Sequence, residues 1–187
     1  MSHPSVPALH PRIALILAEL DAARAELLVL VEPLDDARVT AAPPEGGWSP
    51  LEILGHLGKV EDGISRMVRK LVREAQAAGL PVETDMDVER LVASIAAYDI
   101  VAAERRMIAP PPLLPTPDRS RAEVMQLLAD ARARLVEWLT IGSGHALGTL
   151  RWPHPFFGAL DVYQWGLFTA HHERRHARQI ARALAMA

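Results

Sequence analysis

Residues 165–180 read Trp-Gly-Leu-Phe-Thr-Ala-His-His-Glu-Arg-Arg-His-Ala-Arg-Gln-Ile. Three of the eight histidines of the chain fall within this stretch, and no Gly or Pro interrupts it after Gly166. Its apolar residues have helical spacing, and two histidines four residues apart lie one above the other on a helix face, near enough to share a metal ion. The stretch therefore predicts a long helix that carries part of a site.

The composition favours a helical globular protein. The chain has 187 residues, of which 50% are hydrophobic and only 5% aromatic, so we expect one domain with one core. It has no Cys, which excludes disulfides and thiolate metal sites. A net charge of −3 argues against nucleic-acid binding. No apolar run approaches the roughly 20 residues that span a membrane, and no signal peptide is recognisable, so we expect a cytoplasmic protein without a membrane partner.

Four stretches after a tail of residues 1–10 have the periodicity of amphipathic helices. They are predicted over residues 11–33, 49–77, 120–140 and 161–185. Two of them begin with a capping box, in which a Ser and the Glu three residues later bond each other's backbone N–H groups. These pairs are Ser49 with Glu52, and Ser120 with Glu123.

The connections between these helices differ in length. Residues 33–48 are predicted to form a loop, and residues 141–160 a longer one. Residues 82–117 are predicted to contain a helix over Asp85–Met107 and an extended, proline-rich segment over Ala109–Pro117. No strand is predicted. Because the longest connection follows the second helix, it lets the second and third helices run parallel. The sequence thus predicts an all-α, up-down-down-up four-helix bundle as a single domain over residues 11–187.

The histidines can be sorted by helix face. At 100° per residue, His172 and His176 point with Trp165 and Phe168, so we expect them to face inward. His171 points with four arginines and is expected to be solvated; these are Arg174, Arg175, Arg178 and Arg182.

His56 also takes a core direction, on the second helix. A lone inward histidine is more often a hydrogen-bonded core residue than a ligand. Antiparallel packing of the second and fourth helices, however, brings His56 to the level of His172 and His176. Three neutral imidazoles leave a coordination position open, as in catalytic zinc sites.

The connecting segments at the two ends of the bundle are expected to contribute differently to this site. The loop at 33–48 and the segment 109–117 lie at the predicted metal's end and are expected to form the substrate mouth. The loop at 141–160, with His145 and His154, is expected at the opposite end.

Residues 172–176 match H-E-x-x-H, the zinc metalloprotease motif in which Glu is the general base. Such proteases need a further ligand downstream, and only 11 residues follow His176. We therefore reject this interpretation and expect Glu173 to pair with arginines on the outer face. A di-iron site is also rejected, since it needs inward glutamates on several helices.

The chain resembles the DinB/YfiT-like superfamily, in particular its DinB_2 branch. The features that carry the resemblance are Gly47-Trp48-Ser49-Pro50, His56-Leu57, His154-Pro155, Phe157-Gly158, Trp165, and His172-x-x-Arg175-His176-x-x-Gln179-Ile180. The resemblance implies an up-down-down-up bundle, often homodimeric, with a divalent metal bound by three histidines. The sequence does not identify the metal, since three imidazoles suit Zn, Ni, Cu or Fe(II). The three histidine ligands of the family match His56, His172 and His176.

Three functions follow as hypotheses. Some relatives are transferases or isomerases that use low-molecular-weight thiols. This implies a metal-dependent thiol transferase that acts on a small molecule. Others are regarded as metal-dependent hydrolases, in which the ion acidifies a water molecule. The third hypothesis is a non-catalytic, stress-associated binding protein whose histidines are structural.

Overall fold

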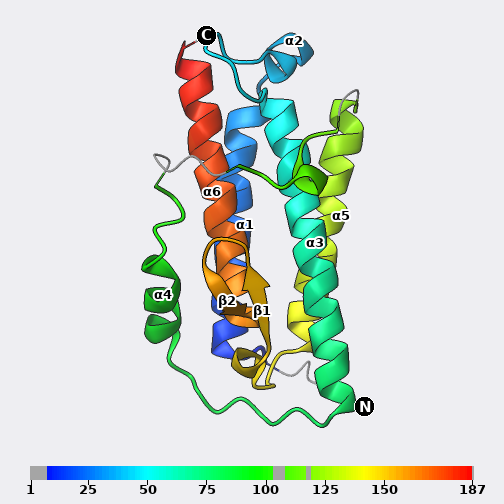
Figure 1. The fold of residues 1–187 in the computed structure, drawn as a ribbon, viewed down its shortest axis with the longest axis vertical. Helices are drawn as coiled ribbons and strands as arrows, with labels where there is room; N and C mark the ends of the chain where they lie inside the picture. The colour runs from blue at the N-terminus through cyan, green and yellow to red at the C-terminus, as the bar shows by residue number, and fades with distance from the viewer. Residues whose placement is uncertain (1–7, 103–107, 117–118, 187) are drawn as a thin grey trace, which may run out of the picture.

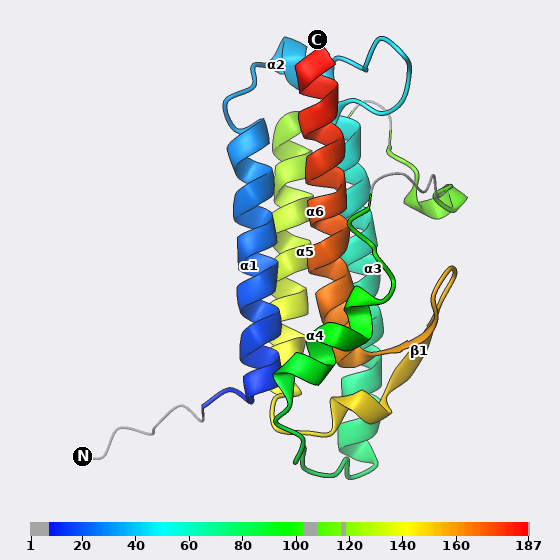
Figure 2. The ribbon, with the colours of Figure 1, turned by 90° about the vertical axis from the view of Figure 1, so that its left-hand side faces the viewer.

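The computed structural model describes residues 8–102, 108–116 and 119–186. Four long helices lie side by side along the molecule (Figure 1 and Figure 2). They are α1 (Pro11–Val31), α3 (Pro50–Ala77), α5 (Arg121–Ile141) and α6 (Val162–Met186). In Figure 1 the chain ascends in α1 and α6 and descends in α3 and α5. The predicted four-helix bundle is confirmed. No helix of the described ranges is both long and apolar enough to cross a membrane.

Both predicted capping boxes are present. The Ser49 hydroxyl accepts a hydrogen bond from the Glu52 N–H at 3.2 Å, and the Glu52 carboxylate accepts one from the Ser49 N–H at 2.8 Å. Ser120 and Glu123 form the same pair at the start of α5. Pro50 occupies the first turn of α3, where its missing N–H would have had no partner. Local chemistry therefore sets where these two helices begin.

Two glycines let helix backbones approach closely. The most extensive packing is between α3 and α5 and between α1 and α6. A Cβ added to Gly58 would lie 2.8 Å from Leu127 across the first of these pairs, and one added to Gly166 would lie 2.6 Å from Ile16 Cγ2 across the second. Both distances are too short for a real side chain, so the glycines fix the spacing of the two pairs.

A closed ring of ion pairs joins the four helices in the core. Arg24 of α1 donates to Glu173 of α6 at 2.5 Å and to Glu61 of α3 at 2.9 Å. Arg132 of α5 donates to Glu61 at 2.5 Å and to Glu173 at 2.6 Å. The expectation that Glu173 lies on the outer face is wrong: its side chain is only 3% exposed. The reason is that two arginines on other helices reach inward and neutralise it.

The connection between α3 and α5 contains less helix than predicted. Its helix is α4 (Val88–Ala96), which packs on α6 and α1, whereas the sequence predicts Asp85–Met107; residues 103–107 lie outside the described ranges. Asp87 caps the start of α4 by accepting from the Arg90 N–H at 2.8 Å. Beyond its end, Asp99 has a φ of 45°, which a right-handed helix cannot contain.

Two further segments differ from their predicted form. The proline-rich segment is not wholly extended, because Pro111–Leu113 forms a 3₁₀ turn, η1, in which Leu113 N–H donates to Pro110 O. The φ of proline suits such a turn. Pro117 lies outside the described ranges. The loop at 33–48 contains a short helix, α2 (Asp36–Thr40), capped by Asp35.

A β-hairpin precedes α6, although no strand is predicted there. After the 3₁₀ turn η2 (Leu147–Thr149), strand β1 (Arg151–His154) pairs antiparallel with β2 (Gly158–Asp161). Each strand has only four residues, and β1 contains Pro153, a residue type that normally argues against a strand. Asp161 accepts from the Gln164 N–H at 2.9 Å at the start of α6, so the predicted start of this helix is confirmed.

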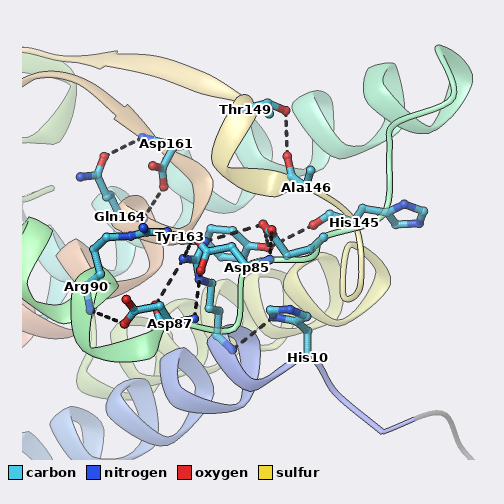
Figure 3. Close-up of polar contacts among 12 residues, drawn as sticks. His10, Asp85, Asp87, Arg90, His145, Ala146, Thr149, Asp161, Tyr163 and Gln164 are labelled. Carbon is cyan, nitrogen blue, oxygen red and sulfur yellow. Dashed lines mark hydrogen bonds and ion pairs between the residues drawn. The ribbon is translucent and has the colours of Figure 1, made fainter.

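Polar contacts around Tyr163 tie the base of the bundle together (Figure 3). The Tyr163 hydroxyl lies 3.0 Å from both the Glu83 carboxylate and the His145 carbonyl oxygen. The Arg12 guanidinium lies 5.4 Å from the centre of the Tyr163 ring and forms ion pairs with Glu83 and Asp85. The starts of α1 and α6, the chain before α4 and the turn before the hairpin are thereby joined.

Replacement of Gly166 by Ala tests the close approach of α1 and α6. We expect Gly166→Ala to lower the free energy of unfolding by about 1–3 kcal/mol, because the fully buried Ile16 has no room to move. Gly63→Ala is the matched control, since a Cβ there meets nothing within 4 Å and alanine favours a helix by about 1 kcal/mol. Urea unfolding measures both. Equal stability of the two variants would contradict the close approach.

Removal of one charge tests the ion-pair ring. We expect Glu173→Gln to lower the free energy of unfolding by about 3–5 kcal/mol, because it leaves a buried arginine charge uncompensated. Glu19→Gln is the control, since Glu19 pairs with Arg174 at 2.6 Å but its side chain is 34% exposed, and it should cost under about 1 kcal/mol. A loss no larger for Glu173→Gln than for the control would show that the ring does not hold the helices.

Candidate metal centre

Three buried histidines meet between α3 and α6. His56 lies in the second turn of α3, and His172 and His176 lie one turn apart on α6. Each offers a ring nitrogen, and these nitrogens all lie within 4.8 Å of one another. The Nε2 atoms of His172 and His176 are 3.2 Å apart. The structure thus brings together the three histidines that the sequence selects, in a group that could hold a metal ion.

Hydrogen bonds orient two of the three rings. His56 Nδ1 lies 2.8 Å from the carbonyl oxygen of Leu113, and His176 Nδ1 lies 2.9 Å from Gln179 Oε1. Both partners are acceptors, so each Nδ1 carries the proton and each Nε2 presents a lone pair. Metal-binding histidines usually have such a partner, which fixes the tautomer and the ring orientation.

Burial keeps these imidazoles neutral. It lowers the pKa of His176 to about 3, with a further contribution from His56. Burial also lowers the pKa of His172 well below the ordinary value, and that of His56 to a smaller extent. A proton on His172 Nε2, or a cation placed between the rings, relieves the repulsion between facing lone pairs. The donor set therefore fits a divalent cation, and three imidazoles suit Zn, Ni, Cu or Fe(II).

The three histidines open into a cavity of about 1090 Å³. Residues 45–48 and 108–110, together with Leu113 and Leu114, line it, as do α3 and α6. The two segments predicted to form the mouth thus both contribute to its wall. Most other lining residues are apolar or aromatic; they include Val60, Ile64, Met67, Trp165 and Phe168. The volume is enough for a small molecule.

The hairpin also lines this cavity, although the sequence places residues 141–160 at the opposite end. Residues 152–156 all contribute to the wall. A strand advances about 3.3 Å per residue and a helix only 1.5 Å, so a hairpin of four-residue strands reaches about as far along α6 as His172. The Trp165 indole N–H donates to Trp152 O at 3.3 Å and fastens the hairpin to α6.

Three residues near the histidines differ from the helical-face prediction. Arg175 is half-buried, lines the cavity and donates to the carbonyl oxygens of Ile100 and Ala102, so it is not part of a solvated face. His171 is half-buried but does not line the cavity. Glu173 does not line it either, and both of its carboxylate oxygens are bound by arginines. Glu173 is therefore unavailable as a general base beside the histidines.

The groups that orient the donor rings were not predicted from the sequence. Gln179 follows His176 by three residues, a spacing at which helix side chains meet, so the sequence contained an indication of this partner. The partner of His56 is the backbone carbonyl of Leu113, which no sequence pattern indicates. His154 lines the cavity, whereas the sequence places it elsewhere.

Comparisons with known proteins agree with this fold. The family model described as DinB superfamily matches residues 19–180. The chain is 28% identical over 168 residues to an uncharacterised protein, YuaE, of Bacillus subtilis (strain 168), covering 84% of this chain and 90% of the relative. It is similar to the crystal structure of TT2238, a four-helix bundle protein, with 27% identity, a TM-score of 0.60, and coverage of 91% of this chain and 98% of the other. The chain belongs to the DinB superfamily.

Proposed function

We propose that the protein binds a divalent metal ion through His56, His172 and His176 and transfers a low-molecular-weight thiol to a small electrophilic substrate. The observation that carries the proposal is the set of ring nitrogens within 4.8 Å of one another at the wall of a cavity of about 1090 Å³. The resemblance to a family with thiol-dependent members supports the choice of reaction.

The chemistry of the cavity favours a thiol over water as nucleophile. A bound divalent cation supplies Lewis acidity, which lowers the pKa of a thiol or of water. Among the described residues that line the cavity, Glu45 is the only carboxylate. The cavity therefore offers few groups that could act as a base to activate water. A thiol, with an ordinary pKa of about 8.5, ionises with far less help than water at about 15.7. Apolar and aromatic side chains form most of the cavity wall around such a nucleophile.

Metal binding tests the donor set. We expect the wild-type protein to bind about one Zn²⁺ or Ni²⁺ per chain. His56→Ala should weaken the affinity by at least about 100-fold, because loss of a ligand exceeds the effect of losing an orienting partner. His171→Ala is the matched control, since His171 adjoins His172 but does not line the cavity. Elemental analysis and calorimetric titration measure the binding. Equal affinity in His56→Ala and His171→Ala would refute the assignment.

Thiol transfer tests the reaction. With cysteine and chlorodinitrobenzene as probes, the metal-loaded wild type should exceed His56→Ala by at least about 100-fold, because Lewis acidity contributes several kcal/mol. Equal rates in both proteins would sink the transferase proposal. Ester hydrolysis without thiol that depends on His56 would favour the hydrolase. Absence of any thermal shift with Zn²⁺, Ni²⁺ or Mn²⁺ would favour a bundle with structural histidines.

A further inference from the structure

His154 is held rigidly among aromatic rings at the end of β1. Its ring stacks on Phe157 with centroids 4.6 Å apart and an interplanar angle of 19°. It contacts the Phe168 ring edge-on at 4.6 Å and lies 5.1 Å from the Trp165 ring. The residue is only 8% exposed. The orientation of this imidazole is therefore set by the hairpin and α6 together.

One nitrogen of this ring is used by the backbone and the other is not. His154 Nδ1 accepts a hydrogen bond from the Phe156 N–H at 3.1 Å, so in the neutral ring the proton lies on Nε2. Burial lowers the pKa of His154 to about 4, which keeps the ring neutral near pH 7. No described residue accepts from Nε2, and Nε2 is not among the buried atoms left without a partner. The N–H therefore reaches the open space of the cavity that His154 lines.

This N–H faces the same space as the candidate metal centre. Phe168 contacts both rings, since it lies edge-on to His154 and stacks on His172 with centroids 5.3 Å apart. The two imidazoles are thus separated by no more than two ring contacts. Both line the one cavity, together with His56 and His176. A small molecule bound to the donor set would therefore share its cavity with His154.

We propose that His154 is a substrate-binding residue that donates its Nε2–H to an oxygen atom of the small molecule held at the candidate metal centre. The inference rests on the proposed function, because the other end of that molecule binds the metal. A neutral imidazole that resists protonation is suited to polarise a carbonyl group. The ligand class is therefore a small molecule that carries a metal-binding atom and, a few bonds away, a carbonyl or comparable oxygen.

Two matched probes test this inference on the metal-loaded protein. β-Mercaptopropionamide has a thiol and an amide, and isopentanethiol carries methyl groups in place of the amide oxygen and nitrogen. The variants are His154→Phe, which keeps an aromatic ring but removes the donor, and His154→Gln, which restores an N–H donor. Calorimetric titration gives the affinities, and metal content and thermal unfolding are measured on the same samples.

We expect His154→Phe to bind the amide about 3–10-fold more weakly, as the loss of one hydrogen bond predicts, with unchanged affinity for isopentanethiol and unchanged metal content. His154→Gln should recover part of the loss. An equal change for both probes, or none for either, overturns the role of His154 while leaving the metal centre intact. A wild-type protein that binds no metal overturns the proposed function and this inference together.

Discussion

The ring of ion pairs among Arg24, Glu61, Arg132 and Glu173 is the interaction on which the rest of the structure depends. Each helix of the bundle contributes one member, and each carboxylate is bound by both guanidinium groups. Buried charges are strongly destabilising unless they are paired, so a slip of any helix would leave charges uncompensated. Glu61 lies little more than one turn after His56 in α3, and Glu173 directly follows His172 in α6. The ring therefore sets the level at which the histidines meet.

Helix α6 serves both the ring and the cavity, because neighbouring residues on a helix point about 100° apart. Glu173 faces the arginines of α1 and α5, whereas His172 faces His56 of α3. On the cavity side, burial keeps the imidazoles neutral and their lone pairs available, and the nearby charge of Arg175 adds to this effect. On the other side, both carboxylate oxygens of Glu173 are paired with arginines. Only the first of these two buried faces is open to a small molecule.

Much of this arrangement could be predicted from the sequence. The capping boxes at Ser49 and Ser120 locate two helix starts, since they depend on neighbouring residues alone. Helical periodicity selects His172 and His176, and antiparallel packing adds His56, the three that the structure brings together.

What could not be predicted depends on contacts between distant segments. Helical periodicity predicts that Glu173 is a solvated charge. Its partners Arg24 and Arg132 lie on other helices, and the sequence does not show how those helices are rotated about their axes. Arg175 bonds the carbonyl oxygens of Ile100 and Ala102, which no side-chain pattern indicates. The hairpin was not predicted, because its strands are short and β1 contains Pro153. The position of His154 in the cavity could therefore not be predicted either.

X-ray absorption spectroscopy on the metal-loaded protein identifies the atoms bound to the ion without reference to activity, and so tests the three histidine ligands themselves. For the protein loaded with Zn²⁺, we expect three imidazole nitrogens at about 2.0–2.1 Å together with at least one light atom that the protein does not supply. A spectrum with fewer than three imidazoles, or with a carboxylate from the chain in their place, would contradict the assignment of His56, His172 and His176 as the ligands.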